Sequence, residues 1–161
     1  GSATIEEVGL LNYIKTHSEE YTFIDRSIAK NEEEKRQIHA KAILSDYYLM
    51  STNAFTMDGQ LVNIDGNGNR VSALCYGPKH VVIITGMNKL TPSVEDAYKR
   101  IRQDACPPNC VRLGLPTPCS KTGVCGDCMS ASSICDLFVT TRMSRYPDRI
   151  HIIMVGEELG Y

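Results

Sequence analysis

His80-Val81-Val82-Ile83-Ile84-Thr85-Gly86 is the most clearly patterned segment of this 161-residue chain. Its centre is a continuous run of β-branched apolar residues, and a glycine ends it. Such a run is typical of a strand that is buried on both faces, and strands of this kind occur in parallel sheets that helices cover. The segment therefore predicts an α/β fold built around a mainly parallel sheet.

Helical and extended patterns alternate on either side of this strand. Met57-Asp58-Gly59 is a hairpin signal between short strands. Thr4-Ile5-Glu6-Glu7 matches a capping box, with Thr4 as the N-cap of the first helix. Helices are predicted at residues 4–16, 31–44, 71–76 and 94–103, and strands at 21–24, 47–51, 53–56, 60–64, 80–85, 137–141 and 150–155. We therefore predict one α/β domain over residues 1–161, with a mainly parallel sheet flanked by helices.

The composition is that of an ordinary globular protein. Apolar residues make up 42% of the chain, charged residues 22%, and the formal net charge is −2. Lysine and arginine form no block, so the chain lacks the electrostatic signature of a nucleic-acid or anionic-membrane partner. Its apolar runs are far too short to span a bilayer, and no targeting segment is visible. We therefore expect a cytoplasmic protein with neither a nucleic-acid nor a membrane partner.

Ligands of parallel α/β sheets bind in the crevice at the carboxyl ends of the strands. The loops expected there are residues 1–4, 65–70 and 86–89. In Asp65-Gly66-Asn67-Gly68-Asn69-Arg70, the glycines let backbone N–H groups converge on an anion, and the arginine can clamp a carboxylate or phosphate. The alternative is a tight turn with a structural arginine. We predict an anion-binding pocket lined by Ser2, Thr4, Asn67, Gly68, Asn69, Arg70 and Asn88.

Four cysteines, Cys119, Cys125, Cys128 and Cys135, follow the spacing C-x5-C-x2-C-x6-C in the loop at residues 117–135. The loop has glycines, small residues and no apolar periodicity, so it needs another organiser. Four thiolates can bind a zinc ion or an iron–sulfur cluster, and the spacing does not decide between them. Two disulfides or free buried thiols are the alternatives, although the total of seven cysteines argues against a complete disulfide framework.

Several longer motifs together resemble a known family. They are Ser51-Thr52-Asn53-Ala54, Gly59-x-Leu61-x-Asn63-x-Asp65-Gly66-Asn67-Gly68-Asn69-Arg70-Val71, Tyr76-Gly77-Pro78-Lys79, Gly86-x-Asn88-Lys89, Arg112-Leu113, Thr117-Pro118-Cys119-x-x-Thr122-Gly123-x-Cys125-x-x-Cys128 and Val155-Gly156-Glu157-x-Leu159-Gly160-Tyr161. This combination closely resembles the LUD (lactate utilisation) domain family, in its stand-alone, cysteine-containing branch. The resemblance covers nearly the whole chain.

The resemblance implies a fold similar to the NagB/RpiA/CoA-transferase-like architecture and a role in lactate or related organic-acid metabolism. A small anionic metabolite (a carboxylate, a phosphate or an acyl-CoA) is the expected ligand, and iron–sulfur oxidoreductase subunits are possible partners. The alternative is a non-catalytic metal or iron–sulfur accessory, or a redox-sensing partner of oxidoreductases. The resemblance supplies no catalytic residue, so whether the protein is an enzyme stays open.

The resemblance also implies a βα unit before the Gly1-Ser2-Ala3-Thr4 turn, which this chain lacks. A sheet without that unit would expose apolar surface that self-association can cover. We therefore expect a homo-oligomer, with a symmetric dimer as its simplest form.

Overall fold

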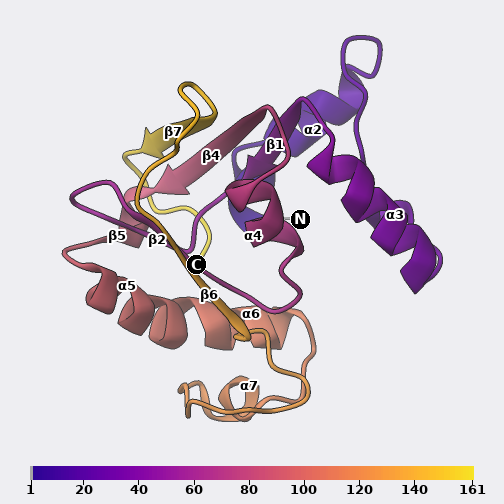
Figure 1. Ribbon diagram of the computed structural model, residues 1–161. Coiled ribbons are helices and arrows are strands. Elements are labelled where there is room, and N and C mark those ends of the chain that lie inside the picture. The colour runs from indigo at the N-terminus through magenta and orange to yellow at the C-terminus, as the bar shows by residue number, and fades with distance from the viewer. Residues whose placement is uncertain (1) are drawn as a thin grey trace.

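The computed structural model of the protein describes residues 2–161 and contains two small sheets with helices around them (Figure 1). Its strands are β1 (Tyr47–Met50), β2 (Ala54–Thr56), β3 (Leu61–Asp65), β4 (His80–Gly86), β5 (Leu90–Thr91), β6 (Leu137–Thr141) and β7 (Ile150–Val155). Its helices are α1 (Ala3–Glu7), α2 (Leu10–Thr16), η1 (Arg26–Ile28), α3 (Glu32–Ile43), α4 (Asn69–Cys75), η2 (Met87–Lys89), α5 (Val94–Arg100), η3 (Ile101–Ala105), α6 (Cys106–Arg112) and α7 (Pro118–Thr122).

The first sheet has β4 at its centre, between β1 and β7, and all three strands are parallel. Val81 and Ile83 in β4 are fully buried, which is what the continuous apolar run predicts. They pack with Met50 and Leu74 in one of the hydrophobic clusters. The prediction of an α/β fold with a parallel sheet flanked by helices is confirmed.

The second sheet has the strand order β5-β2-β3-β6. The hairpin predicted at Met57-Asp58-Gly59 is confirmed: β2 and β3 pair antiparallel, and Gly59 has a φ of 85°. β6 adds antiparallel to β3, while β5 adds parallel to β2. The sequence predicts each of β2, β3 and β6, but not their separation into a second sheet. Strands this short carry no periodicity that assigns them to one sheet or another.

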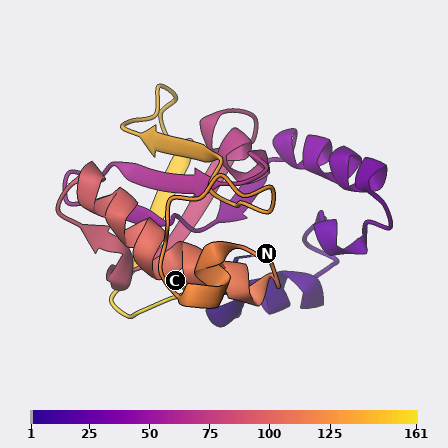
Figure 2. The same ribbon diagram turned by 90° about the horizontal axis from the view of Figure 1, so that it is seen from below.

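A long helical segment, made of α5, η3 and α6, packs on the second sheet and appears below it in Figure 1 and nearest the viewer in Figure 2. Ser93 caps it as predicted, since its hydroxyl accepts a hydrogen bond from the Asp96 N–H at 3.1 Å. The helix continues beyond residue 103 through a π-helical stretch into α6, where Pro107 and Pro108 supply no backbone N–H. The buried residues at this contact are Ala54, Val62, Ile64, Ala97, Ile101, Ala105 and Cys106.

The N-terminal part of the chain differs from the prediction. The single helix at residues 4–16 is wrong, because Gly9 adopts a left-handed φ of 73° and separates α1 from α2. The capping box is also wrong: Ser2 occupies the N-cap, and Thr4 is buried inside α1. Residues 21–24 form no strand, since no neighbouring strand offers them hydrogen bonds. Gly1, part of the predicted loop at residues 1–4, lies outside the described residues.

Candidate functional site

Lys89 is the most unusual ionisable residue near the carboxyl ends of the parallel strands. It ends η2, the helical turn after β4, and only 3% of its surface is exposed. Its Nζ donates hydrogen bonds to Thr4 Oγ1 at 3.0 Å and to Ser51 Oγ at 3.1 Å. Thr4 comes from α1, and Ser51 directly follows β1. Three segments far apart in the sequence therefore meet at one buried ammonium group.

The surroundings of this ammonium are positively charged. Burial, followed by the charges of Arg100 and Arg70, lowers the pKa of Lys89 to about 8, and the carboxylate of Glu7 partly opposes this shift. In the part of the chain that the structure describes, Lys89 forms no ion pair with a carboxylate. Arg100 donates to the carbonyl oxygens of Asn53 at 2.8 Å and Asn88 at 3.0 Å. We call Thr4, Ser51, Lys89 and Arg100 the Lys89 cluster.

Arg70 lies beside this cluster, and its guanidinium group is occupied by protein acceptors. Nη1 donates to Ser51 O at 3.3 Å and Asn63 Oδ1 at 2.6 Å. Nη2 donates to Asn53 Oδ1 at 2.8 Å and Ile64 O at 2.9 Å. A ligand would have to displace these acceptors to gain a bidentate contact. The geometry therefore makes Arg70 a residue that holds the end of β1 against β3.

The glycine–asparagine loop already holds an anion, which is the side chain of Asp65 at its own start. The carboxylate of Asp65 accepts hydrogen bonds from Gly68 N at 3.2 Å and Val71 N at 3.3 Å, at the beginning of α4. Its Oδ2 also lies 3.6 Å from Arg70 Nε. An external anion at this loop would compete with Asp65. The loop has the backbone N–H donors that the sequence predicts for an anion site. In the structure these donors bind the carboxylate of Asp65 instead of an external ligand.

The chain near residue 160 covers the Lys89 cluster. Thr4 Oγ1 donates to Leu159 O at 3.4 Å, and Asn88 exchanges hydrogen bonds with Leu159 N at 3.2 Å and Gly160 O at 3.3 Å. Gly160 N donates to a Glu7 carboxylate oxygen at 2.7 Å. Gly160 has a φ of 59°, and a Cβ there would lie 2.6 Å from Thr4 Oγ1. Glycine is therefore required for this close approach.

The structure brings together part of the predicted anion pocket. Thr4 and Asn88 lie at the Lys89 cluster, and Arg70 reaches it through Ser51. Ser2 is half-buried before α1, Asn67 is exposed, Gly68 is buried and Asn69 begins α4. Sequence reasoning missed Lys89, Ser51, Arg100 and Gly160 as site residues. The available signal was a lysine immediately after a buried strand, within the quoted motif Gly86-x-Asn88-Lys89.

The four predicted metal ligands are distributed over different parts of the cysteine loop. Cys119 is buried in α7, with its sulfur 3.3 Å from Thr117 Oγ1, while Cys125 and Cys128 are half-buried in irregular chain. Cys135 lies just before β6, and its sulfur is 3.4 Å from that of Cys106 in α6. Among the described residues, no three or more His, Cys, Asp or Glu side chains are placed so that they could hold a metal ion. The zinc or iron–sulfur site stays a prediction.

Burial and neighbouring sulfur atoms raise the pKa of some thiol groups and lower that of another. The hydrogen bond with Cys135 and burial raise the pKa of Cys106 far above its usual range. The same contact lowers the pKa of Cys135 to about 7. Burial raises the pKa of Cys110, which also neighbours Cys119. Cys106 and Cys110 of helix α6 are not among the four predicted metal ligands. They nevertheless lie next to two of them, Cys135 and Cys119.

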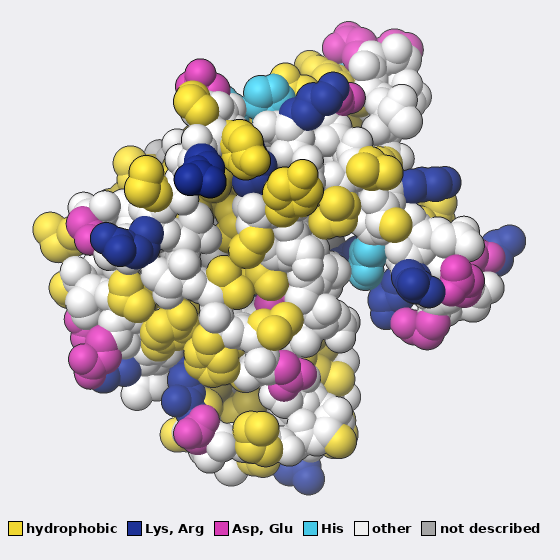
Figure 3. Space-filling view, in the orientation of Figure 1, with side chains coloured by type: hydrophobic (Ala, Val, Ile, Leu, Met, Phe, Trp, Pro, Cys, Tyr) yellow, Lys and Arg dark blue, Asp and Glu magenta, His cyan; other side chains and the backbone are white. Residues whose placement is uncertain are grey.

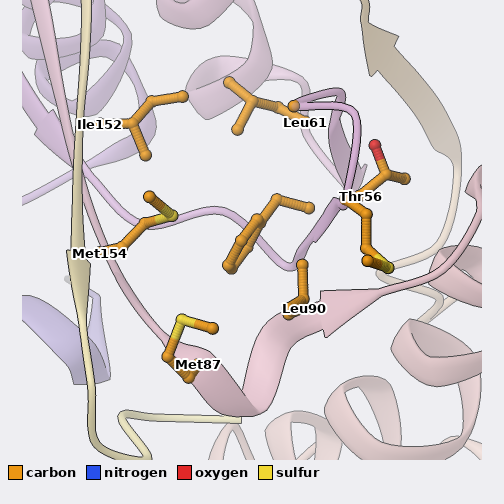
Figure 4. A pocket seen from close by; sticks show the side chains of 9 residues that line it. Thr56, Leu61, Met87, Leu90, Ile152 and Met154 are labelled. Carbon is orange, nitrogen blue, oxygen red and sulfur yellow. The ribbon is translucent and has the colours of Figure 1, made fainter.

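An apolar groove lies between β7, the β2–β3 hairpin and the segment from Met87 to Leu90. It has a volume of about 360 Å³, and Figure 4 shows the side chains of Ile152 and Met154 on β7 facing Met87, Leu90 and Leu61. No ionisable side chain lines it. Hydrophobic side chains also gather along the middle of the face in Figure 3. The groove suits apolar groups and lacks the charge that an anion needs; self-association of the protein stays a prediction.

The LUD domain family matches residues 1–155, so the chain belongs to the LUD domain family. Its fold is similar, with a TM-score of 0.40 and 16% sequence identity, to a crystal structure of a DUF162 family protein from Deinococcus radiodurans. The likeness covers 73% of this chain, and the chain spans 58% of the length of that one. No curated protein matches the chain. No described helix meets the length and hydropathy that a bilayer crossing requires.

Proposed function

We propose that this LUD-domain protein binds a small organic anion of lactate-related metabolism at the Lys89 cluster. The observation that carries the proposal is a buried ammonium group whose partners are hydroxyl groups and whose charged neighbours include two arginines. A buried cation without a counter-ion costs several kcal/mol. A carboxylate or phosphate oxygen would supply the missing negative charge, and Thr4 and Ser51 would supply hydroxyl groups beside it.

Access to the cluster determines the binding step. Because Lys89 is 3% exposed, an anion reaches Nζ only after Leu159 and Gly160 move away from Thr4 and Asn88. The contacts that close the cluster are a few hydrogen bonds and the packing of Leu159 against Ile5 and Ile84, so their release is a local opening of this segment rather than an unfolding of the sheet. Glu7 holds Gly160 in the closed position through its carboxylate. The negative charge of Glu7 would repel an incoming anion, and the positive charges of Arg70 and Arg100 would attract it.

The ligand classes that family membership supports are a 2-hydroxy acid such as lactate, a phosphate and an acyl-CoA. Their common feature is an oxyanion that an ammonium can bind through charge-assisted hydrogen bonds. Turnover of a 2-hydroxy acid or an acyl-CoA would identify an enzyme, and binding without turnover would identify a binding protein. Under both descriptions, the anion would bind at the Lys89 cluster.

Calorimetry at pH 7 with lactate, phosphate and acetyl-CoA tests the proposal. We expect at least one to bind, and Lys89→Met to weaken that binding by tenfold or more, which is about 1.4 kcal/mol. Lys79→Met is the matched control, because Lys79 is exposed and paired with Asp46. Methionine fills a similar volume without burying a charge, so the variant should fold. Equal affinity of the Lys89→Met and wild-type proteins, or no binding by the wild type, would overturn the proposal.

A further inference from the structure

Two sulfur atoms outside the Lys89 cluster lie in contact although their residues are 29 positions apart in the chain. Cys106 is buried at the first position of α6, and Cys135 is half-buried in the segment that leads into β6. Their sulfur atoms are 3.4 Å apart. Neither is in a disulfide. A disulfide S–S bond is about 2.05 Å long, so the two atoms need to approach by about 1.4 Å.

We propose that Cys106 and Cys135 form a reversible disulfide that links helix α6 to the start of β6 when the protein meets a peroxide. Cys106 lies in a helix and Cys135 in irregular chain, an arrangement that allows the bond to close. Cys106 belongs to a packed helix cluster with Ala105 and Ile101, and Cys135 packs against the same cluster from the end of an irregular loop. Side-chain rotation and a small loop shift at Cys135 can therefore bring the sulfur atoms together without moving the helix.

The reaction balances with hydrogen peroxide as the oxidant. The S–H bonds of Cys106 and Cys135 and the O–O bond of the peroxide break, and one S–S bond forms. The two electrons lost by the sulfur atoms pass to the peroxide oxygens, which leave as two water molecules with the thiol hydrogens. A dithiol reverses the step: it becomes a disulfide, and its two hydrogens restore the protein thiols.

The disulfide would act on the loop beside the Lys89 cluster. Asp136 N donates to Asp65 O at 3.2 Å. On the other side of Cys135, the Cα of Ile134 lies 3.1 Å from the position that a Cβ on Gly66 would occupy. The residues that flank Cys135 therefore touch the loop that contains Asp65, the partner of Arg70. The link would tie the oxidation state of the cysteines to the rigidity of this loop. This inference does not depend on anion binding.

Peptide mapping of the full chain tests the pair. After treatment with hydrogen peroxide, alkylation and tryptic digestion, peptides 103–112 and 122–142 should be cross-linked until dithiothreitol separates them. Cys106→Ser and Cys135→Ser should each abolish this cross-link. Cys110→Ser is the matched control on the same helix, and Cys128→Ser is the control on the same loop; both should retain it. Fragment spectra of the wild-type cross-link assign the bonded cysteines even where a variant fails to fold.

Two results would overturn the inference. One is the absence of the cross-link, or a cross-link that persists in Cys106→Ser or Cys135→Ser. The other comes from elemental analysis of protein purified without oxygen: bound zinc or iron that protects Cys135 from alkylation until a chelator removes it. That second result would instead support the site at Cys119, Cys125, Cys128 and Cys135.

Discussion

The Lys89 cluster and the cysteine loop differ in what holds their reactive groups in place. At the cluster, residues from α1, from the position directly after β1 and from η2 converge, and hydrogen bonds between side chains fix Thr4, Ser51 and Lys89. The cysteine loop contains one short helix, α7, and several exposed apolar residues, including Val124 and Met129. Buried polar networks fix one arrangement because each unmade hydrogen bond is costly. The cluster is therefore preorganised, whereas the cysteine loop has fewer buried contacts that fix its arrangement.

The largest expected effect on stability concerns Arg70. Arg70→Met removes four hydrogen bonds and takes the guanidinium away from the largely buried carboxylate of Asp65, which then keeps only neutral backbone donors. Breaking such an arrangement on one side costs about 3–5 kcal/mol. Urea unfolding followed by circular dichroism measures the loss. Arg112→Met is the control, because Arg112 is exposed and its side chain hydrogen-bonds, among the described residues, to Asn109 alone; it should change the free energy of unfolding by less than about 0.5 kcal/mol.

The next effect is a pH dependence that Lys89 produces. Its pKa is about 8 in the folded protein against 10.5 for the free side chain, so between these values the unfolded chain holds the extra proton. Stability therefore rises with pH in this window, by about 3 kcal/mol from this residue. We expect Lys89→Met to lack that rise and to be the more stable protein, relative to wild type, at pH 7. We compare the free energies of unfolding of the wild type and Lys89→Met from pH 7 to 10.5, because their difference cancels the contributions of tyrosines and cysteines. A difference that does not change with pH would contradict the burial of a charged Lys89.

A smaller effect concerns the closure of the cluster. Gly160→Ala places a Cβ against Thr4 at a positive φ, which should cost about 1–2 kcal/mol and displace Leu159. Gly156→Ala is the control, because a Cβ there meets nothing within 4 Å. The rate at which an amine-reactive acetylating reagent modifies Lys89 can be followed by mass spectrometry. This rate should be higher in Gly160→Ala than in the wild type and unchanged in Gly156→Ala. Equal rates would show that residue 160 does not control access.

The smallest effect distinguishes the cysteine loop from the cluster. Cys125→Ser and Cys128→Ser should change the free energy of unfolding of metal-free, reduced protein by less than about 0.5 kcal/mol, because both side chains are partly exposed in irregular chain. Cys110→Ser, at a site with 1% exposure, should cost about 1–3 kcal/mol. A large loss at Cys125 or Cys128 in this metal-free, reduced state would mean that these side chains make stabilising contacts within the chain, and would contradict their placement in partly exposed, irregular chain.

The sequence predicts the central strand, the hairpin, β6 and β7 because each carries a local signal: an apolar run, a turn glycine or a stretch of β-branched residues. It does not predict the break at Gly9, since an amphipathic pattern continues across it. In the site, Thr4 and Asn88 follow from strand-end topology. Lys89 was missed because a lysine in sequence gives no sign of being buried. Cys106 was missed for a related reason: its contact with Cys135 depends on tertiary packing between α6 and the loop.

The most direct test of the account is the pKa of Lys89, measured from the chemical shift of its side-chain carbons during an NMR pH titration with and without the best-binding anion. We expect a pKa of about 8 in the free protein. A bound anion favours the charged ammonium, so the pKa should rise toward 10.5 when the anion is saturating. The affinity should correspondingly fall as the pH rises above 8. A pKa near 10.5 in the free protein, or one that the anion leaves unchanged, would contradict the assignment of Lys89 as the anion-binding residue.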